Sequence, residues 1–123
     1  MVWWHRFRCP PVWGETDCIE FLRAWLWWRH DVDVPRPPGL DVEWQSGTSE
    51  EQIAHWDEGL KAGDFVPVDP LTLVDVMLVD RSGLPSLSVR YHDGYLTRTQ
   101  TGVSRARGSV LRTYRYEGPS CRQ

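Results

Sequence analysis

The spacing of apolar residues changes once along this chain, and that change limits the folds that it can adopt. Up to about Ala62 apolar residues recur at helical spacing, whereas from Leu71 onward short segments alternate between apolar and polar residues. Helical spacing indicates helices packed by one side, and alternation indicates strands that bury one side. Helices followed by a run of strands predict an α+β domain. At 123 residues the chain is long enough for one such domain with its own core.

The first predicted helix spans about Cys18 to His30, since Asp17 and Glu20 have the spacing of a capping box. Its apolar residues cover well over half of the helix circumference, which is wider than packing against one sheet requires. We therefore expect either that this helix is buried on two sides, or that part of it faces a partner or a second copy of the chain.

The second predicted helix begins at Thr48 or Ser49 and ends near Ala62, because Gly63 is a natural C-terminal cap. Between the helices, residues 31–40 form a Pro-rich linker, and residues 41–45 have the pattern of a short strand. The buried stripe of this helix is expected to be Ile53, Trp56 and Leu60.

Four strands are predicted in the second half of the chain, at residues 71–79, 87–92, 95–100 and 110–116. Asp93-Gly94 is a strong two-residue hairpin signal between the second and third of them. The predicted fold is therefore two helices packed on a four-stranded antiparallel β-meander.

The full chain, residues 1–123, is predicted to be a single domain with three parts. Residues 1–14 form an aromatic, basic N-terminal arm, where adjacent prolines forbid a helix. Residues 18–62 form the helical part, and residues 71–116 form the antiparallel sheet.

Charge is sorted along the sequence. Residues 41–80 hold ten carboxylates and one lysine, a net charge of −9, and residues 81–123 hold eight arginines and two carboxylates, a net charge of +6. The chain as a whole carries only −3. Such a dipolar chain favours oriented encounter with a charged partner, and pairing between two copies would satisfy the same charges in a homodimer.

Eight tryptophans in so short a chain suggest that some of them lie at a binding surface. Trp27 falls on the polar side of the first helix, between Glu20 and Arg23, and carboxylates line the exposed side of the second helix. The leading hypothesis is therefore a protein-binding surface that meets a partner with a basic surface. Its residues are Trp3, Trp4, Trp27, Glu50, Glu51, Asp57 and Glu58.

An alternative hypothesis is single-stranded nucleic-acid binding by an Arg/Tyr-rich side of the sheet, since arginines interleaved with aromatic residues are typical of such proteins. It is the weaker of the two, because the chain is acidic overall, with a pI of about 5.7. The residues of this alternative are Arg90, Tyr95, Arg105, Arg107, Arg112 and Arg115.

Sequence motifs give no support for an enzyme, and we predict no catalytic residue, metal or cofactor. The sequence lacks a phosphate-binding loop, a dinucleotide fingerprint, a nucleophile elbow and a Cys-x-x-Cys pair. His5, Cys9, Cys18 and His30 match no zinc spacing, and the last two lie about three turns apart on one helix. Carboxylate pairs such as Asp31 with Asp33, or Asp75 with Asp80, would be the alternative for a small enzyme.

Composition suggests where such a protein comes from and what kind it is. Thirteen arginines against one lysine, with no asparagine, indicate a GC-rich genome, such as that of a GC-rich bacterium or of a virus that grows in one. No apolar run approaches the ~20 residues of a membrane span, and no secretory signal is recognised, so a cytoplasmic location is expected. These traits suggest an inhibitor or accessory factor of a phage or mobile element, or an immunity-type protein. A virion assembly component is a further alternative.

Overall fold

The structure is a computed structural model that describes residues 2–36 and 47–121. Its helices are the short 3-10 helix η1 (His5–Phe7), α1 (Cys18–His30) and α2 (Ser49–Ala62). Its strands are β1 (Phe65–Pro67), β2 (Val76–Arg81), β3 (Leu84–Tyr91), β4 (Gly94–Arg98), β5 (Val103–Arg105) and β6 (Val110–Tyr116). The predicted α+β class is confirmed. The short strand expected at residues 41–45, and the linker beyond Arg36, lie outside the described residues.

The sheet corrects the predicted four-stranded meander. It has six strands in the order β1-β6-β2-β3-β4-β5, and every neighbouring pair is antiparallel. Strands β2 to β5 follow one another as hairpins, but β6 returns across the sheet to pair with β2, and β1 pairs with its outer edge. The prediction missed β1 and β5 because each has only three residues, too few for an alternating pattern to be recognised.

Tight turns set the register of the hairpins. Ser82 and Gly83 both have positive φ, 55° and 85°, as a two-residue type I′ connection between β2 and β3 requires. The next turn is one residue earlier than predicted, because Tyr91 pairs with Gly94 and leaves His92-Asp93 as the loop. Gly108, with a φ of 112°, lies so close to the carbonyl of Asp80 that no larger residue fits there.

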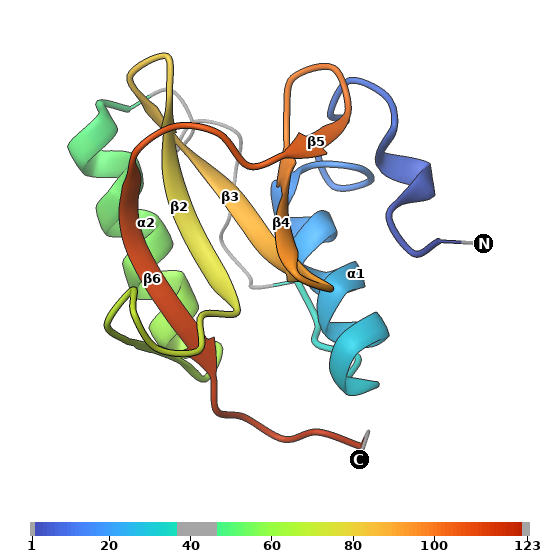
Figure 1. The fold of residues 1–123 in the computed structure, drawn as a ribbon. Helices are drawn as coiled ribbons and strands as arrows, with labels where there is room; N and C mark the ends of the chain where they lie inside the picture. The colour runs from blue at the N-terminus through green and yellow to red at the C-terminus, as the bar shows by residue number, and fades with distance from the viewer. Residues whose placement is uncertain (1, 37–46, 122–123) are drawn as a thin grey trace.

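Helix α1 is buried on two sides, which accounts for part of its broad apolar arc. One side packs on the sheet, where the indole of Trp25 is fully buried and donates a hydrogen bond to the Arg90 carbonyl at 2.8 Å. The N-terminal segment covers another side, with the Phe7 and Trp3 rings 5.2 Å and 5.1 Å from Phe21. In Figure 1 both helices lie behind the sheet, and the N-terminal segment lies at the α1 side.

Helix α2 has the predicted ends and most of the predicted stripe. Thr48 and Glu51 form a complete capping box, in which each side chain bonds the backbone of the other. Trp56 and Leu60 are buried, whereas Ile53 is only half-buried. Gln52 is buried instead, and its amide donates to the Gly47 carbonyl at 3.0 Å.

The two faces of the sheet have different compositions. The face toward the helices carries large apolar and aromatic side chains, and it belongs to the hydrophobic core. Its central members are Phe65, Val76, Leu78, Leu87, Val89 and Tyr114. The opposite face, which Figure 1 views directly and which we call the open face, has neither α1 nor α2 packed on it.

Candidate functional site

The N-terminal tryptophans of the leading hypothesis are packed into the structure. The Trp3 ring stacks on Trp28 at 5.8 Å, and the Trp4 ring meets Tyr91 edge-on at 6.4 Å. Both residues are half-buried, and their indole nitrogens are buried with no hydrogen-bond acceptor among the described residues. Trp3 therefore covers Trp28, whereas Trp27, the preceding residue of α1, is exposed.

Trp27 is the most exposed tryptophan that the structure describes, with 57% of its surface accessible. The other described tryptophans, at positions 3, 4, 13, 25, 28 and 56, are buried or half-buried. Residues four apart on a helix share one side, so Arg23 and Asp31 flank Trp27. An uncovered tryptophan on a rigid helix is a common anchor of protein interfaces.

The predicted acidic residues of α2 divide into two pairs. Glu51 belongs to the capping box, and Asp57 pairs with Lys61 at 2.9 Å and accepts a hydrogen bond from the Tyr114 hydroxyl at 2.7 Å. The contacts with Lys61 and Tyr114 hold the pKa of the Asp57 carboxyl below its ordinary value. Glu50 and Glu58 are exposed. The acidic side of α2 that is free for a partner is therefore smaller than the sequence suggested.

A groove of about 480 Å³ lies between α1 and α2. It therefore adjoins the helix that carries Trp27 and the helix that carries the predicted acidic residues. Helix α1 contributes Leu22 and Leu26, and α2 contributes Trp56 and Leu60, with Phe65 of β1 between them. The polar residues that border the groove are Arg23, His55 and Glu58. The α1 border is thus one helical turn from Trp27, and the α2 border includes one of the exposed glutamates. Sequence reasoning missed this groove because it depends on how far apart the two helices lie on the sheet.

The residues of the nucleic-acid alternative are separated by the sheet. Cross-strand partners share a face, so pairing of Arg90 with Tyr95 places both on the open face, and Arg115 joins them through its pairing with Val66. Arg105 pairs with Leu96 and Arg112 with Leu78, which places these two arginines on the helix side. Arg107 is exposed in the loop between β5 and β6. The six residues therefore do not form one surface.

Among the residues that the structure describes, the open face holds no aromatic platform of the kind that stacking on bases requires. Tyr95 is half-buried, and its hydroxyl donates to the Val74 carbonyl at 2.9 Å. The other three tyrosines contact residues elsewhere: Tyr91 the tryptophans, Tyr114 the carboxylate of Asp57, and Tyr116 the ring of His30. These positions weaken the nucleic-acid alternative.

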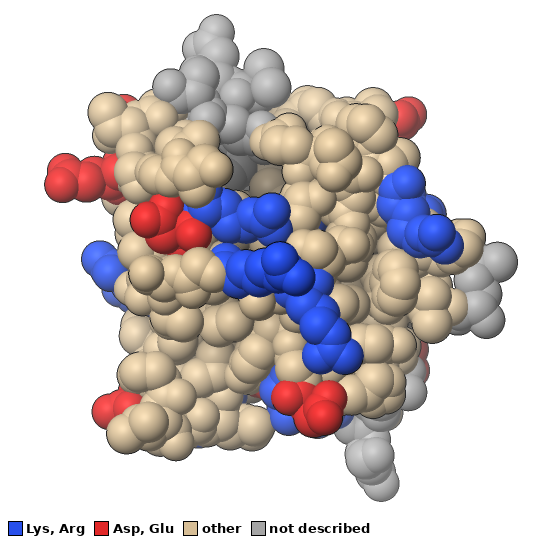
Figure 2. Space-filling view, turned by 45° about the horizontal axis from the view of Figure 1, so that its top comes forward, with Lys and Arg blue, Asp and Glu red and all other residues tan. Residues whose placement is uncertain are grey.

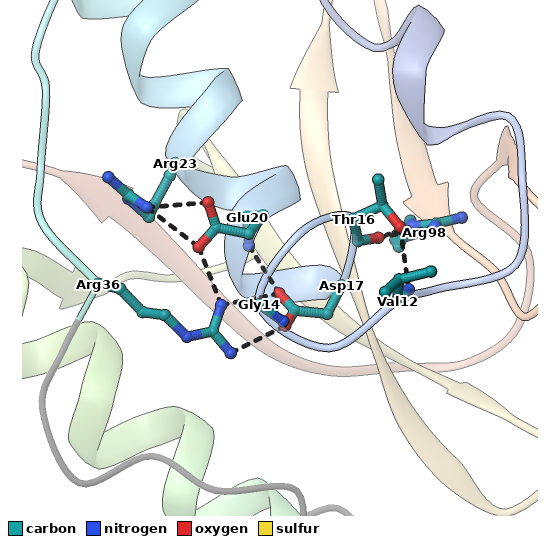
Figure 3. A network of polar contacts seen from close by, with 8 residues as sticks. All are labelled: Val12, Gly14, Thr16, Asp17, Glu20, Arg23, Arg36 and Arg98. Atoms are coloured by element: carbon teal, nitrogen blue, oxygen red, sulfur yellow. Dashed lines mark hydrogen bonds and ion pairs between the residues drawn. The ribbon is translucent and has the colours of Figure 1, made fainter.

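A polar network at the start of α1 was missed by sequence reasoning (Figure 3). The Asp17 carboxylate caps the helix by accepting from the Glu20 and Gly14 amides at 2.9 Å and 2.6 Å. Arg36 bonds both oxygens of Asp17, at 3.1 Å and 2.8 Å, and also Glu20 at 2.9 Å. Burial raises the pKa of Asp17, but the hydrogen bonds from Arg36 and the two amides outweigh it and hold that pKa below its ordinary value. The cap spacing predicted Asp17, whereas no local signal pointed to Arg36.

Arg98 is a buried cation that the sequence did not reveal. Only 5% of its surface is exposed. Its guanidinium donates hydrogen bonds to backbone carbonyls from distant parts of the chain. These are Thr16 at 2.7 Å and 2.9 Å, Phe7 at 2.8 Å and Gly102 at 2.8 Å. Arg98 thereby links the N-terminal segment to β4, and its N–H donors are occupied by these hydrogen bonds.

Several residues that the enzyme alternative would use have clear structural surroundings. Among residues 2–36 and 47–121, no three of His, Cys, Asp and Glu are grouped as a metal site would require. Burial raises the pKa of the Cys18 thiol to about 12, so at neutral pH it is not a nucleophile. Asp31 is the left-handed C-terminal cap of α1, and Asp80 accepts from the Gly83 amide within the β2–β3 turn. Asp31 thus ends α1 through its backbone, and the Asp80 carboxylate belongs to a turn.

Comparisons with protein-family models, with curated proteins and with solved structures found no match to this chain. Of the helices in the described part of the chain, none is long and apolar enough to cross a membrane. A functional conclusion therefore depends on the surfaces of the molecule.

Proposed function

We propose that this chain is a small non-enzymatic protein-binding module that contacts its partner through the groove between α1 and α2. The observation that carries the proposal is the apolar groove of about 480 Å³ with the exposed Trp27 beside it. Apolar grooves between helices take amphipathic segments of other proteins, whose apolar side chains enter the groove. The role is that of an inhibitor or accessory factor, of the phage or immunity type that the composition suggested.

The borders of the groove indicate the chemistry of the partner. On α1, Arg23 is already paired with Glu20 at 2.8 Å and lies 3.7 Å from Asp33. On α2, Glu58 lies at the groove and Glu50 is exposed at the first turn of the same helix. The border thus offers negative charge more than positive charge. The partner segment that fits is apolar on one side and flanked by lysines or arginines.

A capture experiment tests this function. The tagged chain is used to retain proteins from a lysate of a GC-rich bacterium, with and without nuclease, beside Trp27→Ala and Leu71→Ser variants. Leu71 is the matched control, because it is 95% exposed in the β1–β2 loop and is absent from the groove. We expect one protein that resists nuclease, is retained by the wild type and by Leu71→Ser, and binds Trp27→Ala about 30-fold more weakly.

Two results would reject the proposal. Loss of all captured material after nuclease treatment would favour nucleic-acid binding. Equal retention by Trp27→Ala and by Leu71→Ser would show that the contact surface is not beside Trp27.

A further inference from the structure

The open face of the sheet forms a second surface that is separate from the groove. The strand pairing gives its rows: Val66, Arg115, Asp75, Arg90 and Tyr95 at one end, and Arg81 with Leu84 at the other. The central row is uncharged and consists of Thr113, Met77, Ser88, Thr97 and Ser104. Since α1 and α2 both pack on the other side, this surface belongs to no contact described so far.

The open face curls toward its own centre. Arg81 of β2 donates a hydrogen bond to the Ser104 hydroxyl of β5 at 3.2 Å, although two strands separate β2 from β5 in the sheet. Ser88 and Thr97, in the middle of the face, are fully buried, and their hydroxyls lie 2.7 Å apart. The centre of the face is thus closed by the molecule's own side chains, and the parts that a partner can contact are its two ends, where the arginines and the exposed Val66, Leu84 and Val110 lie.

Positive charge on this face exceeds negative charge. Arg81, Arg90 and Arg115 belong to it, whereas its rows hold one carboxylate, that of Asp75, which is buried and bonded to Arg90 at 3.1 Å. Arg115 also bonds Glu117 at 2.8 Å, just beyond the end of β6. Figure 2 shows basic side chains gathered in a band on the side of the molecule that it views, with acidic side chains next to both ends of the band.

Apolar side chains lie among these arginines without cover. Val66, Leu84 and Val110 are 37%, 46% and 50% exposed, and all three project from the open face. Aliphatic side chains gain by burial against other aliphatic side chains, and they make no favourable contact with phosphates. Together with the missing aromatic platform and the acidic net charge of −3, this favours a protein over a nucleic acid.

We propose that the open face docks an acidic segment of a partner protein, in which carboxylates alternate with aliphatic residues. The carboxylates would meet the arginines at the two ends of the face, and the aliphatic side chains would cover Val66, Leu84 and Val110. This inference goes beyond the groove, because the two surfaces lie on opposite sides of the sheet. The proposal for the open face can therefore be wrong while the proposal for the groove is right, and the reverse also holds.

Fluorescence anisotropy with two probes of equal charge tests the proposal. One probe is a labelled peptide of alternating glutamate and valine, and the other is a labelled oligothymidylate. The test variant is Arg81→Gln with Arg115→Gln, and the matched control is Arg105→Gln with Arg112→Gln. The control removes the same charge from exposed residues on the helix side.

We expect the wild type and the control variant to bind the peptide with an affinity that falls as salt is added. The open-face variant should bind it at least about tenfold more weakly. If the double variant does not fold, Arg81→Gln alone serves, since its side chain bonds only Ser104 among the described residues.

Several results would overturn the inference. The first is no binding of the peptide by the wild type, and the second is equal weakening in both double variants. Tighter binding of the oligothymidylate would instead assign the face to nucleic acid. Self-association of the chain alone, measured by sedimentation equilibrium and lost in the open-face variant, would assign the face to a second copy.

Discussion

The two faces of this six-stranded sheet use polar groups in opposite ways. On the helix side, Arg98 and Asp17 are buried among partners that saturate their hydrogen bonds, and the surrounding side chains are aromatic and aliphatic. On the open side, Arg81 is half-exposed and bonds one hydroxyl, and aliphatic side chains beside it are in water. Residue type alone therefore does not distinguish an arginine that holds the fold together from one that can bind a partner. The number of partners around the guanidinium separates them.

Removal of Arg98 should cause the largest loss of stability. The variant Arg98→Met would leave the carbonyls of Phe7 and Thr16 without this donor, and the Gly102 carbonyl would keep only the Thr99 amide. We expect a loss of about 3–5 kcal/mol in the free energy of unfolding, measured by urea denaturation. A loss below about 1 kcal/mol would show that water reaches this site and that the helix side is less closed than described.

Asp17 should contribute less than Arg98, and its contribution should depend on pH. Its folded-state pKa is lowered, so it stabilises the fold above the unfolded value of about 3.9, and this stability is lost as the pH falls through the folded pKa. Asp17→Asn keeps the cap but removes the charge that Arg36 binds, at a cost of about 1.5–3 kcal/mol at pH 7. Urea melts between pH 7 and pH 2 should show a shallower decline for the variant. If the free energy of unfolding of the wild type and of the variant declined equally with falling pH, the role assigned to the Asp17 charge would be contradicted.

The buried hydroxyl pair of the open face tests how closed its centre is. Ser88→Ala or Thr97→Val alone leaves one buried hydroxyl without its partner, at a cost of about 1–2 kcal/mol. The double variant should cost less than the sum of the two, because no unpaired hydroxyl remains. Additive losses in a double-mutant cycle would show that the hydroxyls are solvated independently.

Arg81 should matter least for stability, although it lies on the surface that we assign to a partner. Arg81→Met removes one hydrogen bond to a serine hydroxyl at a half-exposed position. The change in the free energy of unfolding should stay within about 0.5 kcal/mol. A loss similar to that of Arg98→Met would remove the distinction between the two faces.

Local signals in the sequence were enough for the helices and the main hairpins. Asp17, Thr48 and Gly63 define helix ends through contacts within a few residues, and the observed bounds of both helices agree with the predicted ones. The Asp93-Gly94 signal likewise placed a turn between β3 and β4, one residue from its observed position. Such features depend on neighbours in the sequence, which a pattern can reveal.

The rest depends on contacts between distant residues. Strand β6 pairs with β2 across an irregularity at Leu78 and Val79, and its register decides that Arg112 lies on the helix side. Arg36 reaches back to Asp17, and Arg98 reaches the carbonyl of Phe7, 91 residues away. No periodicity indicates such partners. The candidate surface changed for the same reason, because Trp3 packs on Trp28 and is only half-exposed, whereas Trp27 is exposed.

Gly59 gives the most direct test of the central claim, that the groove between α1 and α2 is the contact surface. It borders the groove within α2, and a Cβ added there meets no atom within 4 Å. Gly59→Ala and Gly59→Leu should both stabilise α2, by about 1 kcal/mol or less, but only leucine projects far enough to occupy the groove. The measurement is the affinity of both variants for the captured partner. We predict that Gly59→Ala binds as the wild type does and that Gly59→Leu binds at least about tenfold more weakly. Equal affinities would contradict the account.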